Sequence, residues 1–188
     1  MPRAGLTPSV VVAQARELAD EAGFSQLTLA AVAQRLGVAL PSLYKHVRGV
    51  EDLQRQIAAQ GLRELADAVT RATAGKSRTT ALRALADAYW EYAHAHPGSY
   101  AATLRAPSSD DTETALVATR LLDVVYAVLE GYGVTGEDAV DATRTLRALL
   151  HGFVALEAAG GFGMPNDVRQ SFNRAVDAFD LSLSNWRR

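Results

Sequence analysis

Apolar residues recur at spacings of three and four along almost the whole chain, which is the periodicity of one face of an α-helix. In the first such segment, Val11, Ala15 and Leu18 follow this spacing between Thr7, a helix-capping residue, and Gly23, a helix-ending one. No segment alternates strictly between apolar and polar residues, as a half-buried strand would. The sequence therefore predicts an all-α fold of about nine helices.

The predicted helices form two groups. Three short helices occupy residues 1–50, and five or six longer ones occupy residues 51–188. The last helix is predicted to begin after Asn166, whose side chain can cap it. The second and third helices of the first group, joined by Gly37-Val38-Ala39, have the dimensions of a helix-turn-helix unit. We therefore predict two domains, a helix-turn-helix domain over residues 1–50 and a larger helical domain over residues 51–188.

Composition excludes several classes of protein. Of the 188 residues, 48% are hydrophobic and the net charge is −2, so disorder is not expected. The absence of cysteine rules out disulfides, cysteine-ligated metals and a thiol nucleophile. No uncharged run approaches the roughly 18 residues of a membrane-spanning helix, and the first apolar run is too short for a signal peptide. We expect a soluble, cytoplasmic protein with no membrane partner.

The distribution of charge says little about partners. Residues 1–60 carry six Lys and Arg against five Asp and Glu, a net charge of +1, and residues 61–188 carry thirteen against sixteen. This asymmetry is too small to indicate nucleic-acid binding by itself.

One stretch near the N-terminus carries the pattern of a helix-turn-helix. Thr28 can cap a helix that stops at Gly37, and a short third helix follows and is broken by Gly49. At about 100° per residue, Leu43 and Val47 share the inward face of that third helix. The opposite and flanking positions suit contacts with phosphates, base edges and thymine methyl groups. They are Leu40, Pro41, Ser42, Tyr44, Lys45, His46 and Arg48. A surface helix whose cations are merely solvated is the alternative.

The segment TLAAVAQRLGVALPSLYKHVRGVEDL, residues 28–53, resembles the DNA-binding head of the tetracycline-repressor (TetR) family of bacterial transcriptional regulators. The resemblance implies phosphate contacts from Thr28 and Tyr44. It also implies a base-facing set made of Leu40, Pro41, Ser42 and Lys45, with His46 at the edge of the contact. The partner would be double-stranded DNA with a palindromic operator.

Two positions depart from the family pattern. Many members carry a phosphate-binding lysine at the start of the fourth helix, where this chain has Val50. Arg48, or the free backbone N–H groups of that helix, are the candidates to replace it. Some members also read a base from the second helix at the position of Ala30, whose methyl group can contribute little.

A second resemblance covers YWEYAHAHPGSY, residues 89–100, and RALLHGFVALEAAGGFGMPNDVRQSF, residues 147–172. Both are similar to the WHG-type ligand-binding domain of one branch of TetR regulators, with Trp90, His151 and Gly152 at the matching positions. The resemblance implies a homodimer in which the last two long helices form a four-helix bundle with their partners. Candidate interface residues are Leu149, Phe153, Leu156, Phe172, Val176 and Phe179. The same apolar stripes would also serve as core, so we expect both uses on different sides of each helix.

The resemblance further implies a small, mostly apolar effector held inside the helical body. Candidate pocket residues are Trp90, Tyr100, Leu104, Tyr126 and His151. The aromatic residues among them also suit ordinary core packing. His151 is either a core histidine bonded to a neighbour or a polar anchor for the ligand.

Enzymatic alternatives find little support. Glu91 and His94 form an E-x-x-H unit, but a di-iron bundle needs two such units and two further glutamates, and the chain has no second one. Neither a G-x-S-x-G elbow nor a glycine-rich phosphate loop is present. We therefore expect no catalytic residue, metal or cofactor. The favoured function is a repressor released from its operator by the effector, and the alternative is a helical ligand-binding protein or enzyme whose head no longer binds DNA.

Overall fold

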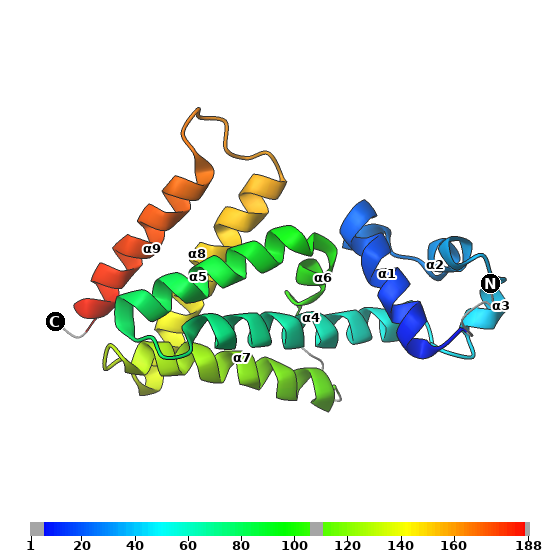
Figure 1. Cartoon of the computed structure of the whole chain (residues 1–188), viewed down its shortest axis with the longest axis horizontal. Coiled ribbons are helices and arrows are strands. Elements are labelled where there is room, and N and C mark those ends of the chain that lie inside the picture. The colour runs from blue at the N-terminus through cyan, green and yellow to red at the C-terminus, as the bar shows by residue number, and fades with distance from the viewer. Residues whose placement is uncertain (1–5, 106–110, 187–188) are drawn as a thin grey trace. The chain divides into compact units, whose positions relative to one another are not determined.

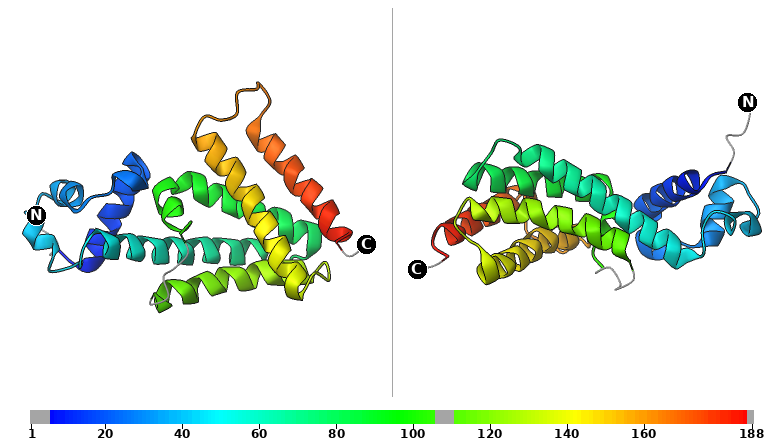
Figure 2. Two further views of the ribbon diagram at one scale, coloured as in Figure 1. Left: turned by 180° about the vertical axis from the view of Figure 1, so that it is seen from behind. Right: turned by 90° about the horizontal axis from the view of Figure 1, so that it is seen from below.

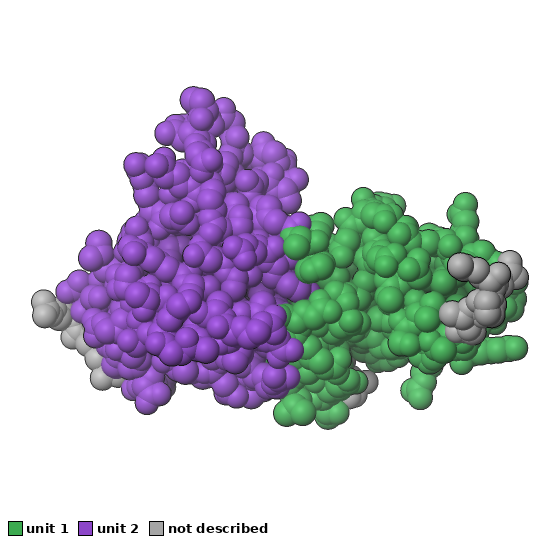
Figure 3. Space-filling view, in the orientation of Figure 1, with its two compact units in different colours: residues 1–64, 95–117 green, residues 65–94, 118–188 purple. Residues whose placement is uncertain are grey.

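The computed structural model describes residues 6–105 and 111–186, and within these ranges it contains nine α-helices, one 3-10 helix and no strand (Figure 1). This confirms the predicted all-α class. The helices belong to two compact units (Figure 3). The first comprises the chain up to residue 64 together with residues 95–117, and the second comprises residues 65–94 together with the chain from residue 118 onward.

The first unit begins with three α-helices and a 3-10 helix. They are α1 (Pro8–Ala22), η1 (Phe24–Gln26), α2 (Leu29–Leu36) and α3 (Leu40–Leu43). Both predicted caps are present, because the Thr7 hydroxyl accepts the N–H of Val10 at 3.3 Å and the Thr28 hydroxyl accepts the N–H of Ala31 at 3.2 Å. α2 ends at Gly37, whose φ of 65° and ψ of 33° are the left-handed conformation that glycine adopts without steric cost.

One apolar cluster holds these helices together. Val11 of α1, Val32 of α2 and Leu43 of α3 are fully buried in it. Leu53 and Ile57, from the first half of α4 (Val50–Thr73), are equally buried in the same cluster. Burial of each such side chain stabilises the fold by about 1.5–3 kcal/mol. Residues 51–64, which the sequence assigned to the second domain, therefore lie in the first unit.

The third helix is shorter than predicted. Its α-helical part ends at Leu43, and residues 44–46 form a turn. The Leu43 carbonyl accepts the N–H groups of both His46, at 2.8 Å, and Val47, at 3.0 Å. Because one acceptor is shared in this way, the chain tightens instead of continuing as an α-helix. The predicted inward pair is nevertheless confirmed, since Leu43 and Val47 are both buried.

The remaining helices are α5 (Arg78–Ala95), α6 (Pro97–Ala102), α7 (Thr112–Glu130), α8 (Gly136–Ala158) and α9 (Val168–Ser184). In the second unit, α8 and α9 lie side by side (Figures 1 and 2). Phe172 of α9 is fully buried. Its ring centroid lies 4.5 Å from that of Trp90 on α5 and 5.6 Å from that of Phe153 on α8. An aromatic core therefore joins three helices of this unit.

Polar contacts connect α5 to α9 along their length. The Thr79 hydroxyl donates to Asp180 at 2.8 Å, and Arg83 pairs with Asp177 at 2.8 Å. Arg169 pairs with Asp87 in the same way.

The cap of α9 differs from the prediction by one residue. The Asp167 side chain accepts the N–H of Gln170 at 2.6 Å, so Asp167 caps the helix and Asn166 does not. Asparagine and aspartate are about equally good capping residues. When the two are adjacent, the path of the preceding loop determines which of them caps the helix.

Candidate nucleic-acid interface

The residues predicted to face DNA share one region of the first unit, at the start of α2, on α3 and in the turn that follows. Leu40 is 37% exposed and Tyr44 is 58% exposed, although both are large and largely apolar. Thr28, Pro41, Lys45 and Arg48 are exposed, and Ser42 and His46 are partly exposed. The turn thus presents aromatic, aliphatic and cationic groups together directly above the buried Leu43 and Val47.

The Thr28 hydroxyl caps α2 and can still donate a hydrogen bond to another group. Its oxygen accepts the Ala31 N–H and so caps α2. A hydroxyl can accept and donate at the same time. The exposed hydroxyl hydrogen of Thr28 therefore remains suited to a phosphate oxygen.

An ionic clamp fixes α2 against α1. The Arg35 guanidinium, in the last turn of α2, donates to both carboxylate oxygens of Glu21 at 2.5 Å and 2.7 Å. It also donates to Glu17 and Gln14, each at 3.2 Å. The hydrogen bonds from Arg35 lower the pKa of Glu21 below its usual range. Bidentate geometry makes this contact between α1 and α2 directional.

Asp52 anchors the other side of the turn at residues 44–46. Its carboxylate accepts the backbone N–H of Arg48 at 3.0 Å, the Arg55 guanidinium at 3.0 Å and the Gln56 amide at 3.2 Å. The Arg48 N–H, followed by Arg55, lowers the pKa of Asp52. Asp52 is the third residue of α4. An acidic third residue in a helix can also reach back to the N–H groups before it, as in a capping box, and this signal could have identified the anchor.

A polar cleft of about 1020 Å³ lies beside this turn. Its walls come from the start of α1, the turn after α3, α4 and the start of α7, and include Lys45, Arg48, Arg55 and Arg63. Arg63 forms an ion pair with Glu113 across it. Because charged and polar groups dominate its lining, the cleft does not match the apolar pocket predicted for an effector.

The predicted effector residues occupy different environments. Trp90 and Tyr100 are buried, Leu104 and His151 are partly exposed, and Tyr126 is exposed on α7. Trp90 is packed against polar neighbours as well as apolar ones, with the His94 ring centroid at 4.4 Å and the Arg169 guanidinium 5.1 Å from its own centroid. The pocket therefore stays a prediction.

His94 has a structural role within the second unit. Its Nδ1 lies 2.8 Å from the Trp90 carbonyl oxygen and its Nε2 lies 2.7 Å from the Glu157 carboxylate, so it joins α5 to α8. Among the residues that the structure describes, no three His, Asp or Glu side chains are grouped so that they could hold a metal ion.

The predicted dimer residues divide into two sets. Phe172, Val176 and Phe179 are buried within the single chain, whereas Leu149 and Phe153 are partly exposed and Leu156 is 50% exposed. Around Leu156, α8 carries small residues that are exposed or partly exposed, namely Ala148, Gly152 and Ala155. A β-carbon on Gly152 would meet open space. On α9, Leu181 is 66% exposed.

These features define a helix-turn-helix DNA-binding protein with a helical body, and comparison with known proteins agrees. The family described as "Bacterial regulatory proteins, tetR family" matches residues 11–57, and "Tetracyclin repressor-like, C-terminal domain" matches residues 82–179. The chain therefore belongs to the tetracycline-repressor family of ligand-responsive, DNA-binding transcriptional regulators.

Relatives along nearly the full length support this membership. The chain is 34% identical to the uncharacterized HTH-type transcriptional regulator YobS of Bacillus subtilis, over 95% of this chain and 93% of that protein. It is 39% identical to the uncharacterized HTH-type transcriptional regulator Rv0681 of Mycobacterium tuberculosis, over 84% of this chain and 72% of that protein.

Solved structures share the fold. A Rhodococcus sp. RHA1 protein of unknown function has 25% identity and a TM-score of 0.79, covering 97% of this chain and 98% of that one. A variant of TetR from Acinetobacter baumannii, solved in complex with minocycline, has 21% identity and a TM-score of 0.73, covering 98% of this chain and 99% of that one. In the parts of the chain that the structure describes, no helix has the length and apolar character needed to cross a bilayer.

Proposed function

We propose that the chain is a homodimeric repressor that binds a palindromic operator and leaves it when a small apolar effector enters the helical body. The observation that carries the DNA-binding part is the exposed set of Leu40, Tyr44 and Lys45 on a turn whose other side is fully buried. A surface of this kind, held rigidly from behind, suits insertion into a major groove. As a regulator of genes it would act in the cytoplasm and without enzymatic activity.

The individual residues divide between two kinds of contact. Thr28 and Tyr44 would bind phosphates through their hydroxyl groups, which fixes the register of the protein on the duplex. Lys45 would reach a base edge, while Leu40 and Pro41 would contact thymine methyl groups. Ser42 and His46 would complete the edge of this contact.

Arg48 would supply the phosphate contact that Val50 cannot make. The Arg48 side chain is exposed, and its backbone is fixed by Asp52, so the guanidinium extends from an anchored point. Because its main chain is already anchored, less conformational entropy is lost when Arg48 forms a phosphate contact.

The outward face of α8 would form the dimer interface, together with Leu181 of α9. Small residues such as Ala148, Gly152 and Ala155 allow two helices to approach closely, and Leu156 supplies apolar area. The aromatic residues of α9 support this face from inside the subunit. With two subunits so joined, each would place its reading turn about one DNA turn, roughly 34–36 Å, from the other.

Release would be a population shift. An effector that binds more tightly to a dimer whose reading turns do not match the operator spacing would favour that state. The size of this shift is limited by the difference between the effector's affinities for the two states of the dimer.

Selection of genomic DNA by the purified full chain tests the proposal. Sheared DNA from the source genome is mixed with the protein at one stated salt concentration, and the bound fragments are sequenced, because non-specific phosphate binding depends steeply on salt. Enrichment of palindromic sites is the expected result. The Lys45→Ala, Tyr44→Ala double variant is the control. If it enriches the same sites as strongly as the wild-type protein, this turn does not read DNA. That result would favour a ligand-binding protein whose head no longer binds DNA.

A further inference from the structure

The last turn of α1 and the first turn of α6 approach each other at backbone distance. A β-carbon on Gly98 would lie 2.2 Å from the carbonyl carbon and oxygen of Ala19 and 2.6 Å from the backbone nitrogen of Asp20. These are main-chain atoms of a helix and cannot turn aside as the end of a flexible side chain could. Glycine is therefore required at residue 98 for α6 to lie where it does.

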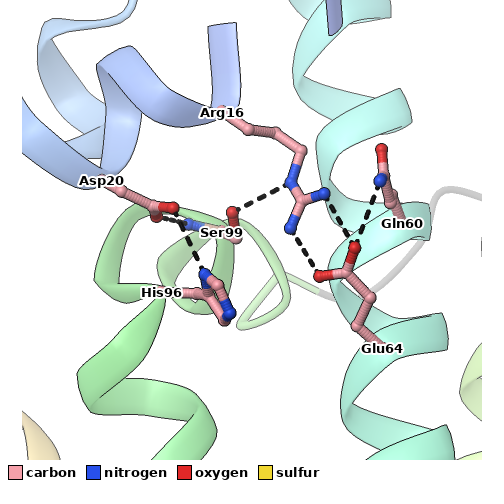
Figure 4. Close-up of polar contacts among 6 residues, drawn as sticks. All are labelled: Arg16, Asp20, Gln60, Glu64, His96 and Ser99. Atoms are coloured by element: carbon pink, nitrogen blue, oxygen red, sulfur yellow. Dashed lines mark hydrogen bonds and ion pairs between the residues drawn. The ribbon is translucent and has the colours of Figure 1, made fainter. Parts of the chain in front are cut away.

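An aspartate of α1 supplies the hydrogen bond that α6 needs at its start. Asp20 Oδ1 accepts the backbone N–H of Ser99 at 2.8 Å, and Asp20 Oδ2 lies 3.7 Å from Nδ1 of His96 (Figure 4). The residue before α6, His96, gives no side-chain cap of its own. Asp20 of α1 thus caps the start of α6, a role that a residue next to the helix in sequence usually fills.

Arg16 joins three helices through one guanidinium group. It donates from Nη1 and Nη2 to the two oxygens of Glu64 on α4, at 2.8 Å and 2.5 Å, and from Nε to the Ser99 hydroxyl at 3.2 Å (Figure 4). Gln60 also donates to Glu64, at 3.1 Å. The Arg16 side chain is only 14% exposed and Ser99 is fully buried. The planar fork fixes both the separation and the angle of the groups it binds.

Apolar packing of α6 rests on Tyr100 and Ala102, both buried, whereas the residues at its first turn are short. Ala102 is the α6 residue that belongs to the apolar cluster of the first unit, while Gly98 and Ser99 offer almost no apolar area. Apolar contact is also non-directional, whereas hydrogen bonds between partly buried groups depend strongly on geometry. The polar contacts of Arg16 and Asp20 therefore add the directional part of the packing among α1, α4 and α6.

We propose that Arg16, Asp20, Glu64 and Ser99 form a latch that holds the reading turn in its DNA-binding orientation. Arg16 and Asp20 are then positioning residues, although neither belongs to the DNA-facing set. α1 and α4 enclose Leu43 in the shared apolar cluster, so a change in their mutual angle moves α3. Base contacts require several side chains to fit at once, whereas non-specific phosphate binding tolerates such a shift. This inference rests on the proposed function.

The test uses the full chain and a charge exchange. The variants are Arg16→Glu, Glu64→Arg, the double exchange and the milder Arg16→Gln. Arg83→Glu, which opposes Asp177 in the second unit, is the matched control. Amide hydrogen exchange of residues 98–102 is measured without DNA. Affinity is measured for a duplex selected by the wild-type protein and for a scrambled duplex, after circular dichroism has shown each variant to be folded.

We expect the single variants to exchange faster in α6 and to lose about tenfold or more in affinity for the selected duplex, comparable with one lost base contact. Binding to the scrambled duplex stays nearly the same. The double exchange restores both properties, because the Ser99 hydroxyl can donate to a glutamate as readily as it accepts from an arginine. Unchanged exchange in Arg16→Gln would overturn the latch itself. Faster exchange with undiminished affinity for the selected duplex would overturn its positioning role, and a wild-type protein that selects no duplex would instead overturn the proposed function.

Discussion

The backbone N–H of Arg48 donates to the Asp52 carboxylate at 3.0 Å, and this bond joins the turn after α3 to the first turn of α4. Arg55 and Gln56 bind the same carboxylate. The turn that carries Tyr44 and Lys45 is therefore held by the Asp52 carboxylate, and the pKa of this carboxylate depends on the fold.

The pH dependence of stability should report this bond. The pKa of Asp52 is lowered in the folded state, mainly by the Arg48 N–H. Its contribution is therefore fully present above the unfolded value of about 3.9 and is lost as pH falls through the lower folded value. Asp52→Asn should unfold at lower urea concentration than wild type at pH 7, and the difference should shrink on acidification. Equal differences at neutral and acidic pH would show that the bond does not depend on the charge.

Lys45 and Arg48 should differ in how they contribute to DNA binding. Lys45→Ala should cost about 1–3 kcal/mol with the selected duplex and relax specificity at one base position, because it removes a base contact. Arg48→Ala should weaken binding to all sequences alike and lower the salt slope by about 1, because it removes a phosphate contact. Fluorescence anisotropy over a range of salt concentrations measures both. Lys76→Ala, in the turn after α4, is the control cation.

Gly98→Ala should destabilise the chain. The added methyl group would overlap the backbone of Ala19, and forced displacement of packed elements costs about 1–3 kcal/mol. Urea denaturation followed by circular dichroism measures the loss. Gly163→Ala is a matched control, since its β-carbon meets open space, and its effect should lie within about 0.5 kcal/mol. Equal stability of the two variants would mean that α6 can shift without cost.

Gly152→Arg should produce folded monomers. The substitution adds a long side chain that points into open space in one subunit, and arginine favours helix more than glycine does. It would block the close approach of two α8 helices. Light scattering after size exclusion gives the mass, and Ala127→Arg, on an exposed position of α7, is the control. A Gly152→Arg protein that remains dimeric would place the interface elsewhere.

Local signals made much of the fold predictable. Thr28 and Gly37 bound α2 as their chemistry suggests, and the spacing of Leu43 and Val47 identified the buried side of the turn. The length of α3 was not predictable, because it depends on how the Leu43 carbonyl is shared between two N–H groups. The cap of α9 was misplaced by one residue, because two adjacent residues offered equivalent capping chemistry.

Contacts between segments that are distant in sequence could not be predicted from such local signals. Phe172 and Phe179 lie on an apolar stripe that suits either a core or an interface, and the structure buries both within the subunit. Arg16 and Glu64 are 48 residues apart, and no spacing rule joins them. The set predicted to face DNA follows from short-range geometry and family resemblance, which point to the same few residues, whereas an effector pocket depends on packing among several helices.

The exposure of Leu40 and Tyr44 also has a thermodynamic consequence. These side chains keep apolar surface in water when no DNA is bound, and the first 60 residues have a net charge of only +1. In the proposed complex DNA covers that surface, so its dehydration would give association a negative change in heat capacity, and a head with few cations would release few counterions. Calorimetry should therefore find binding enthalpy that becomes steeply more favourable on warming, together with a weaker dependence on ionic strength than a strongly basic head would show.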